Sequence, residues 1–423
     1  MMSKFWREWQ YPIEFALLLL FVFFLPLREA PKNLFWLAYV VVWVVNRAKA
    51  RAPDGTWRPA FGPRWGAWDT LLIAWIASGY MAALLGGIHR GDGNELLAVN
   101  DMVKYVTVLW CLLRGGYARE QALAVLGMLV ASCVIAELEA LWNWQVSHKR
   151  RALELVSVGQ VNHSAIYMTI CAGIAASLLL GYWRVLAARW RVLLAGALLL
   201  LMGGLFLTGS RAATGVALVL LVGLTAIAAR TLGLGRMVWA ALAAVIAAGV
   251  LIGGTSALQR QVYLATHDAI LTERDLIWNR GIVAWRATPW FGVGPDNYSQ
   301  ITERDLRAQL AVEGKAFDAR EYRGSPHAHN LYVNQLVERG IIGLAALLAV
   351  LLAWGVLLLR YRPRNSVDPG SLVLWGASFS GWLVTVSIGM VNTTLHHEHA
   401  LLALMTLGLW LAALRERPQS AQT

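Results

Sequence analysis

Long apolar runs, separated by short polar segments, dominate the pattern of the 423-residue chain. A run of about 20 apolar residues lets a helix cross the roughly 30 Å hydrocarbon core of a bilayer. The runs do not alternate between apolar and polar residues, as the strands of a membrane β-barrel would. The pattern predicts about twelve membrane-spanning helices, at residues 12–27, 33–46, 68–88, 96–113, 121–145, 161–181, 191–208, 212–230, 236–254, 340–360, 371–391 and 399–414.

The composition supports an all-α integral membrane protein. Hydrophobic residues make up 58% of the chain and charged residues only 15%, which excludes an ordinary soluble enzyme. The three cysteines lie in or beside apolar runs and indicate neither a disulfide framework nor a cysteine-based metal site. We expect nine helices in residues 1–254, a helical loop domain in residues 255–328, and three helices with a cytoplasmic tail in residues 329–423.

The net charge of +12 is better explained by membrane topology than by nucleic-acid binding. The sequence contains no nucleic-acid-binding motif, and its Arg and Lys residues recur in every second loop. Positive loops stay in the cytoplasm, so both termini are expected there and the long loop outside. The first apolar run lacks a small-residue cleavage site and is interpreted as a retained span.

The long outer loop has an internal pattern of its own. Apolar residues recur at three- and four-residue spacing over residues 268–286, which predicts a helix that Pro289 ends. A turn-rich segment follows at residues 290–297, and residues 301–312 predict a second short helix.

Several basic residues on the outer side do not fit a purely topological role. Arg150 and Arg151 lie in a short outer loop, and Arg211 opens a predicted helix. A guanidinium beside the free N–H groups of a first helical turn favours an anion. The alternative for Arg211 is contact with lipid headgroups. Arg274 and Arg280 lie on the predicted loop helix, where they could equally be solvated surface charges.

A pair of histidines, His327 and His329, precedes the return to the membrane. The pair could bind a metal, act as a general base or cap a turn. Zinc needs about four ligands at recognisable spacing, and the other histidine cluster, which begins at His396, lacks that spacing. No phosphate-binding loop or dinucleotide motif is present, so neither a nucleotide nor a metal is expected.

Taken in order, these motifs resemble the O-antigen ligase family, part of a wider superfamily of ligases and polymerases. The resemblance covers nearly the whole chain, but Glu273 and Ala328 stand where the family often has Gly and Pro. The residues that carry it are Ser210 and Arg211, Arg274 with Trp278, the 289–297 turn with Gly292 and Gly294, His327 to Asn330, Glu338 to Leu344, and the segment around His163.

This resemblance implies a glycosyltransferase of the membrane-embedded C type, acting on the periplasmic face of the bacterial inner membrane without cofactor, metal or nucleotide. The donor would be an undecaprenyl-diphosphate-linked O-antigen and the acceptor a sugar hydroxyl of lipid A-core, with inversion at the anomeric carbon. Arg211 and Arg274 would neutralise the leaving diphosphate, and His329 would be the general base. Substrate-binding roles would fall to Arg150, Arg151, His163, Arg280, His327, Asn330, Glu338 and His396.

Two alternatives remain open from the sequence. An O-antigen polymerase or a protein O-oligosaccharyltransferase would use the same donor chemistry and differ only in its acceptor. A lipid-linked sugar transporter should show broken helices and charges near the bilayer midplane, whereas most conspicuous charges here lie at the outer boundary.

Overall fold

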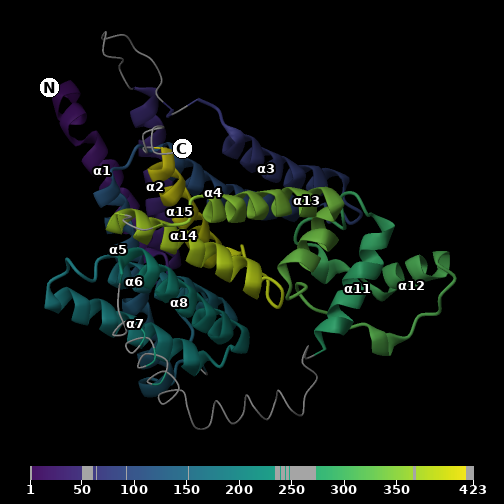
Figure 1. The fold of residues 1–423 in the computed structure, drawn as a ribbon. Helices are drawn as coiled ribbons and strands as arrows, with labels where there is room; N and C mark the ends of the chain where they lie inside the picture. Colours follow the sequence, from purple (N-terminus) through teal and green to yellow (C-terminus); the bar gives the residue numbers. More distant parts are fainter. Residues whose placement is uncertain are drawn as a thin grey trace.

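The computed structural model describes residues 2–49, 61–62, 64–91, 93–150, 152–233, 273–364 and 368–415, with the isolated positions 239, 243 and 247. In this part of the chain the regular structure is entirely helical (Figure 1). The predicted ninth span, at residues 236–254, lies almost wholly outside the described residues.

Eleven of the predicted spans fall on described residues, and each coincides with a helix. Among the described residues, nine helices are long and apolar enough to cross a membrane; the helix on the second predicted span, at residues 33–46, is not one of them, and the first predicted span has only the shorter apolar segment Tyr11–Phe24. The prediction of an all-α membrane protein is therefore confirmed. The helices are α1 (Met2–Phe24), α2 (Glu29–Ala48), α3 (Ala67–Leu85), α4 (Asn94–Arg114), α5 (Arg119–Leu141), α6 (Val161–Gly181), α7 (Ala188–Thr208), α8 (Arg211–Leu232), α13 (Leu331–Arg360), α14 (Pro369–Ile388) and α15 (His397–Arg415).

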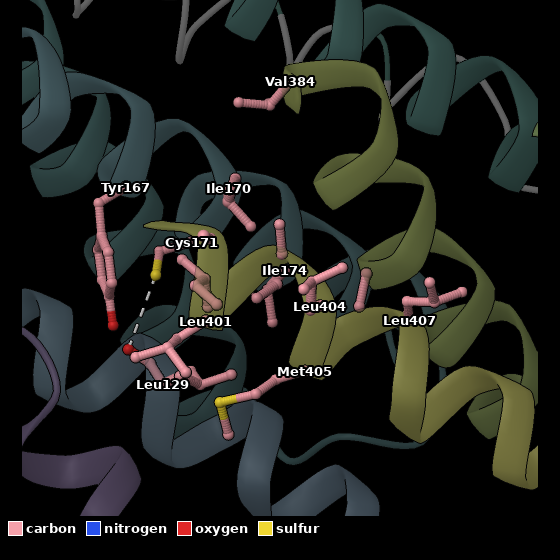
Figure 2. Close-up of a cluster of buried hydrophobic side chains, with 14 of the residues drawn as sticks. Leu129, Tyr167, Ile170, Cys171, Ile174, Val384, Leu401, Leu404, Met405 and Leu407 are labelled. Atoms are coloured by element: carbon pink, nitrogen blue, oxygen red, sulfur yellow. Dashed lines mark hydrogen bonds between the residues drawn. The ribbon is translucent and has the colours of Figure 1, made fainter. Parts of the chain in front are cut away.

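Helix α6 forms the centre of the apolar core, and 94% of its most apolar window is buried. A helix that is hydrophobic all round must be covered on every side. Figure 2 shows how this is done: Tyr167 and Cys171 of α6 face Leu129 of α5 and Leu401 of α15. The Cys171 thiol donates to the Leu129 carbonyl at 3.8 Å, and all three cysteines are buried and free.

Helix α13 is broken at Gly340, where φ is 65° and ψ is −168°. An unbroken 30-residue helix would be about 45 Å long, more than the hydrocarbon core requires. The break leaves 20 residues, 341–360, to span the bilayer and turns residues 331–339 into a separate helical segment. The predicted span at residues 340–360 therefore begins at the break itself.

The outer loop folds as expected where it is described. It contains α11 (Arg274–Ala287), the short η2 (Tyr298–Gln300), α12 (Glu303–Val312) and η3 (Ala319–Glu321). Buried Ile277, Val283, Tyr298, Leu306 and Leu310 give this segment a small core of its own. The segment lies at the end of the bundle away from the start of α1 and the end of α15 (Figure 1).

Candidate functional site

Two arginines from distant parts of the sequence lie close together at this end of the bundle. Arg211 is the first residue of α8 and Arg274 the first residue of α11. Burial and the positive charge of Arg211 both lower the pKa of the Arg274 guanidinium, which shows that the two charges interact. Neither forms an ion pair with any carboxylate in the described ranges. Two neighbouring guanidinium groups without a counter-ion are suited to bind a doubly charged anion.

The histidine loop is fixed to α11 by a tryptophan one turn after Arg274. The Trp278 indole N–H donates to the Ala328 carbonyl at 2.8 Å. On the other side, the Ala328 backbone N–H donates to the Asn334 side chain at 2.9 Å. Ala328 lies between the two histidines and is fully buried. Because Arg274 and Trp278 lie one turn apart on α11, the bond from Trp278 to Ala328 also fixes the position of Arg274 relative to the histidine pair.

His329 adopts a left-handed backbone conformation, with φ at 49°. A non-glycine residue held in this region costs about 1–3 kcal/mol, and such strain concentrates at functional sites. Burial, and secondly the charge of Arg274, lower the pKa of His329 below its usual value of 6.5. Because the imidazole is neutral at pH 7, it can accept a proton.

The His327 ring lies against that of His329, with 4.2 Å between the ring centroids and 58° between the ring planes. Burial, followed by the charges of His329 and His397, lowers the pKa of His327 to about 4. Its Nε2 atom is buried and has no hydrogen-bond partner among the described residues. A buried ring nitrogen without a partner is costly, which indicates that a ligand or water completes it.

The break in α13 joins the outer loop to the membrane helices through a backbone seam, formed by residues 289–294 and 337–342. At the break, the N–H groups of Ile341 and Ile342 donate to the Pro289 and Trp290 carbonyls, at 2.9 and 3.4 Å. The carbonyls of residues 337 and 338, freed in turn, accept from the N–H groups of residues 293 and 294, at 2.8 and 3.0 Å. The glycine motifs of both segments thus serve a single close contact between backbones.

Glycine is required on both sides of this seam. A Cβ atom on Gly340 would lie 2.2 Å from the Trp290 carbonyl oxygen, and one on Gly292 would lie 2.4 Å from the Val337 carbonyl oxygen. Both glycines also have positive φ angles. The sequence resemblance identified these glycines without explaining them, and the structure gives the reason.

A cavity of about 500 Å³ opens beside the histidine pair, between α3, α4 and the segment 331–339. Its walls combine carboxylates, amides, aromatic rings and histidines, but neither arginine of the pair lines it, nor does His329. Four predicted site residues line it together: His163, His327, Glu338 and His396. Histidines from three chain segments meet here, since the His163 ring lies 6.1 Å from that of His396 and 5.5 Å from that of His397.

The remaining predicted residues are held by other contacts. The Asn330 side chain accepts from the N–H groups of Tyr332 and Val333, at 2.9 and 3.0 Å, and so caps α13. Its amide also donates to the Met390 carbonyl at 2.8 Å. Arg280 donates to the Ile301 carbonyl inside the outer loop.

Arg150 also has a partner within the protein, since it pairs with Glu154 at 3.2 Å. Its neighbour Arg151 lies outside the described residues. Glu273, the residue before Arg274 in the sequence, pairs with Arg323.

Gln335 and Arg339 are among the residues of the cavity wall that were not predicted as site residues. Gln335 and Arg339 lie four residues apart, on one face of the segment that follows the histidine pair. The four-residue spacing can be read from the sequence. The sequence does not show whether this face borders a cavity or the apolar core, because that depends on the break at Gly340. In the described residues, no group of three or more His, Cys, Asp or Glu side chains is arranged to hold a metal ion.

The fold and site define a multi-pass helical membrane protein, with a neutral histidine pair and two arginines that form no ion pair among the described residues, at one end of its helices. Residues 195–348, which include both pairs, match the family model described as O-Antigen ligase. Over these residues the chain is similar to that family.

A known protein is also similar to part of this chain. A segment of 112 residues is 33% identical to the exopolysaccharide production protein ExoQ of Rhizobium meliloti (strain 1021). The aligned segment covers 26% of this chain and 24% of that relative, so the chain spans about a quarter of the relative's length.

Proposed function

We propose that this protein is an O-antigen ligase. It transfers a polysaccharide from undecaprenyl diphosphate to a sugar hydroxyl of lipid A-core, on the periplasmic face of the bacterial inner membrane. The observation that carries the proposal is a pair of arginines beside a histidine that is neutral at pH 7. Neither arginine has an ion-pair partner among the described residues. This combination suits a reaction that releases a diphosphate and removes a proton.

In the proposed reaction, the acceptor hydroxyl oxygen attacks the anomeric carbon of the donor from the face opposite the diphosphate. The bond from the anomeric carbon to the phosphate oxygen breaks, and its electron pair stays on the diphosphate. Arg211 and Arg274 stabilise this developing charge, a role that a divalent cation could otherwise fill. The hydroxyl proton passes to His329 as general base. The product is inverted at the anomeric carbon.

The two substrates are assigned to opposite sides of the histidine pair. Arg274 lies near enough to His329 to lower its pKa, whereas the cavity is lined by His327 and by neither arginine of the pair. We therefore assign the diphosphate to the arginine side and the acceptor sugar to the cavity, with His327 orienting the attacking hydroxyl. His163, Glu338 and His396 are then acceptor-side residues, while Asn330 and Trp278 position the loop.

The test is transfer by purified protein, given lipid-linked O-antigen and lipid A-core, in EDTA and without nucleotide. We expect glycan-bearing lipid A-core to form, and R211A, R274A and H329A each to abolish it. The matched control is R286A, because Arg286 lies on the same helix as Arg274 but is exposed and paired with Glu313 at 3.0 Å. Product that forms only with added metal, or full activity in any of the three site variants, would contradict the mechanism.

The similarity to a protein named for exopolysaccharide production favours a polysaccharide polymerase as the second candidate. Such an enzyme would use the same arginine and histidine chemistry but add the donor chain to another lipid-linked chain. The same assay without lipid A-core separates the two: a polymerase lengthens the lipid-linked glycan, and a ligase leaves it unchanged.

A further inference from the structure

The wall of the cavity carries hydrogen-bond donors that the protein leaves unused. The Gln335 Nε2 atom is buried and has no partner in the described part of the chain, as is also true of His327 Nε2. Arg339 has five N–H groups, yet among the described residues its hydrogen bond goes to the Met102 sulfur at 2.8 Å, which is a weak acceptor. Gln335 and Arg339 therefore lack strong acceptors in this part of the chain, and buried donors normally have them.

Two carboxylates of the cavity wall are committed elsewhere. Asp101 pairs with Lys104 at 3.6 Å, and Asp296 pairs with Arg90 at 3.3 Å. A third, Glu338, interacts with the charge of Arg339, but no ion pair to Arg339 forms among the described residues. The guanidinium therefore has N–H groups available to a ligand in the polar cavity.

We propose that Gln335 and Arg339 form a sugar subsite that determines which acceptor the enzyme uses, an inference that rests on the proposed function. The Gln335 amide and the Arg339 guanidinium donate to ring and hydroxyl oxygens of the acceptor sugar. Carboxylates on the same wall accept from its hydroxyl hydrogens, and Trp75 and Tyr105 offer aromatic surface. A mixture of donors, acceptors and aromatic rings matches a polyhydroxylated ligand better than a lipid tail or a bare anion.

The geometry explains why these two residues would act on specificity rather than on the chemical step. They lie one helical turn apart, on the segment between the capped start of α13 and its break at Gly340. Both ends of that segment are fixed, by Asn330 at the start and by the backbone seam at the end. The donors are thus held in place before the sugar arrives, which lowers the entropy cost of binding.

The experiment measures KM for each substrate in full-length protein in nanodiscs. R339Q should raise the KM for lipid A-core by roughly 10- to 100-fold, because a hydrogen bond to a charged group is lost. Q335M should raise it by roughly 2- to 10-fold. The KM for the lipid-linked donor should stay within about twofold in both, and R339K should recover part of the loss.

Control variants with the same substitutions are available in the outer loop. R286Q and Q309M replace residues of the external helices, where the Gln309 amide contacts Glu313 at 3.1 Å. Both controls should leave the acceptor KM unchanged. The proposal is overturned if R339Q and Q335M raise the donor KM instead, or if they change neither KM.

A second measurement keeps the subsite and the proposed function separable. Core oligosaccharide released from lipid A-core is titrated into the protein without donor, and binding is followed by calorimetry. If R339Q and Q335M both weaken the binding seen with wild type, the subsite is supported even if no transfer occurs. Transfer by wild type with unaltered oligosaccharide binding in the variants supports the function and refutes the subsite. If R339Q fails to fold, Q335M decides the question, because it keeps the length of the side chain and removes the amide donor without adding a charge.

Discussion

Replacing Gly340 by alanine tests the claim that the backbone seam places the site. The native backbone, at φ 65° and ψ −168°, lies in a region that only glycine populates readily. Holding alanine there costs about 1–3 kcal/mol. The new Cβ would also lie 2.2 Å from the Trp290 carbonyl oxygen, so the two segments must separate.

The cost of that separation follows from the hydrogen bonds of the break. The N–H groups of Ile341 and Ile342 lose their acceptors in residues 289 and 290, and each bond is worth about 0.5–1.5 kcal/mol. The sum is on the order of 2–6 kcal/mol of lost stability. The control is Gly314→Ala, since Gly314 also has a positive φ, of 70°, but its added Cβ would meet nothing within 4 Å. Gly314→Ala should lose only the free energy of holding alanine at a positive φ angle, about 1–3 kcal/mol.

The free energy of unfolding is measured by dodecyl sulfate titration of the purified proteins, followed by tryptophan fluorescence. Transfer activity is measured on the same preparations. Since a displacement of about 1 Å at a reacting centre can cost roughly 100-fold in rate, Gly340→Ala should lose most activity while Gly314→Ala retains it. Equal stability of the two variants, with activity intact in both, would refute the role given to the seam.

Three further predictions follow from the site. Arg274→Gln removes a charge that helps to lower the pKa of His329, so that pKa, followed by NMR titration of the imidazole, should rise; Arg274→Lys should leave it near the wild-type position, and an unchanged pKa in the Gln variant would show that the two groups do not interact. Trp278→Phe removes the hydrogen bond to the Ala328 carbonyl and should lower kcat by about 2- to 10-fold with little change in thermal stability. A loss of thermal stability with unchanged kcat would mean that Trp278 is a core residue only. His327→Gln should raise the acceptor KM more than it lowers kcat, whereas His329→Gln should abolish kcat, and identical effects would mean that the two histidines do not divide the roles proposed for them.

The membrane-spanning architecture follows from the sequence because burial in a bilayer demands a simple local pattern. Any helix that crosses hydrocarbon must be apolar over about 20 residues, and this signal survives without knowledge of its neighbours. All eleven predicted spans within the described residues coincide with helices. The two helices of the outer loop were also predictable, since each carries a periodic apolar face of its own.

The motifs that resemble the O-antigen ligase family can be recognised in the sequence for a different reason. Ser210 with Arg211, and the residues from His327 to Asn330, stand out as charged or titratable groups at membrane boundaries, where such groups are costly. The sequence could therefore indicate which arginines and histidines to examine. It could not show that Arg211 and Arg274, more than 60 positions apart, lie close enough for one charge to lower the pKa of the other.

The sequence by itself determined the helices and the chemical types of the candidate site residues, because each depends on local composition or short motifs. The tertiary structure decided which of these residues meet, because charges far apart in the sequence come together only when the helices pack. It also decided that Trp278 fixes the histidine loop, that Gln335 and Arg339 face a cavity, and that Gly292 and Gly340 form one backbone contact. The last of these depends on the break in α13, where four backbone hydrogen bonds join residues 289–294 to residues 337–342.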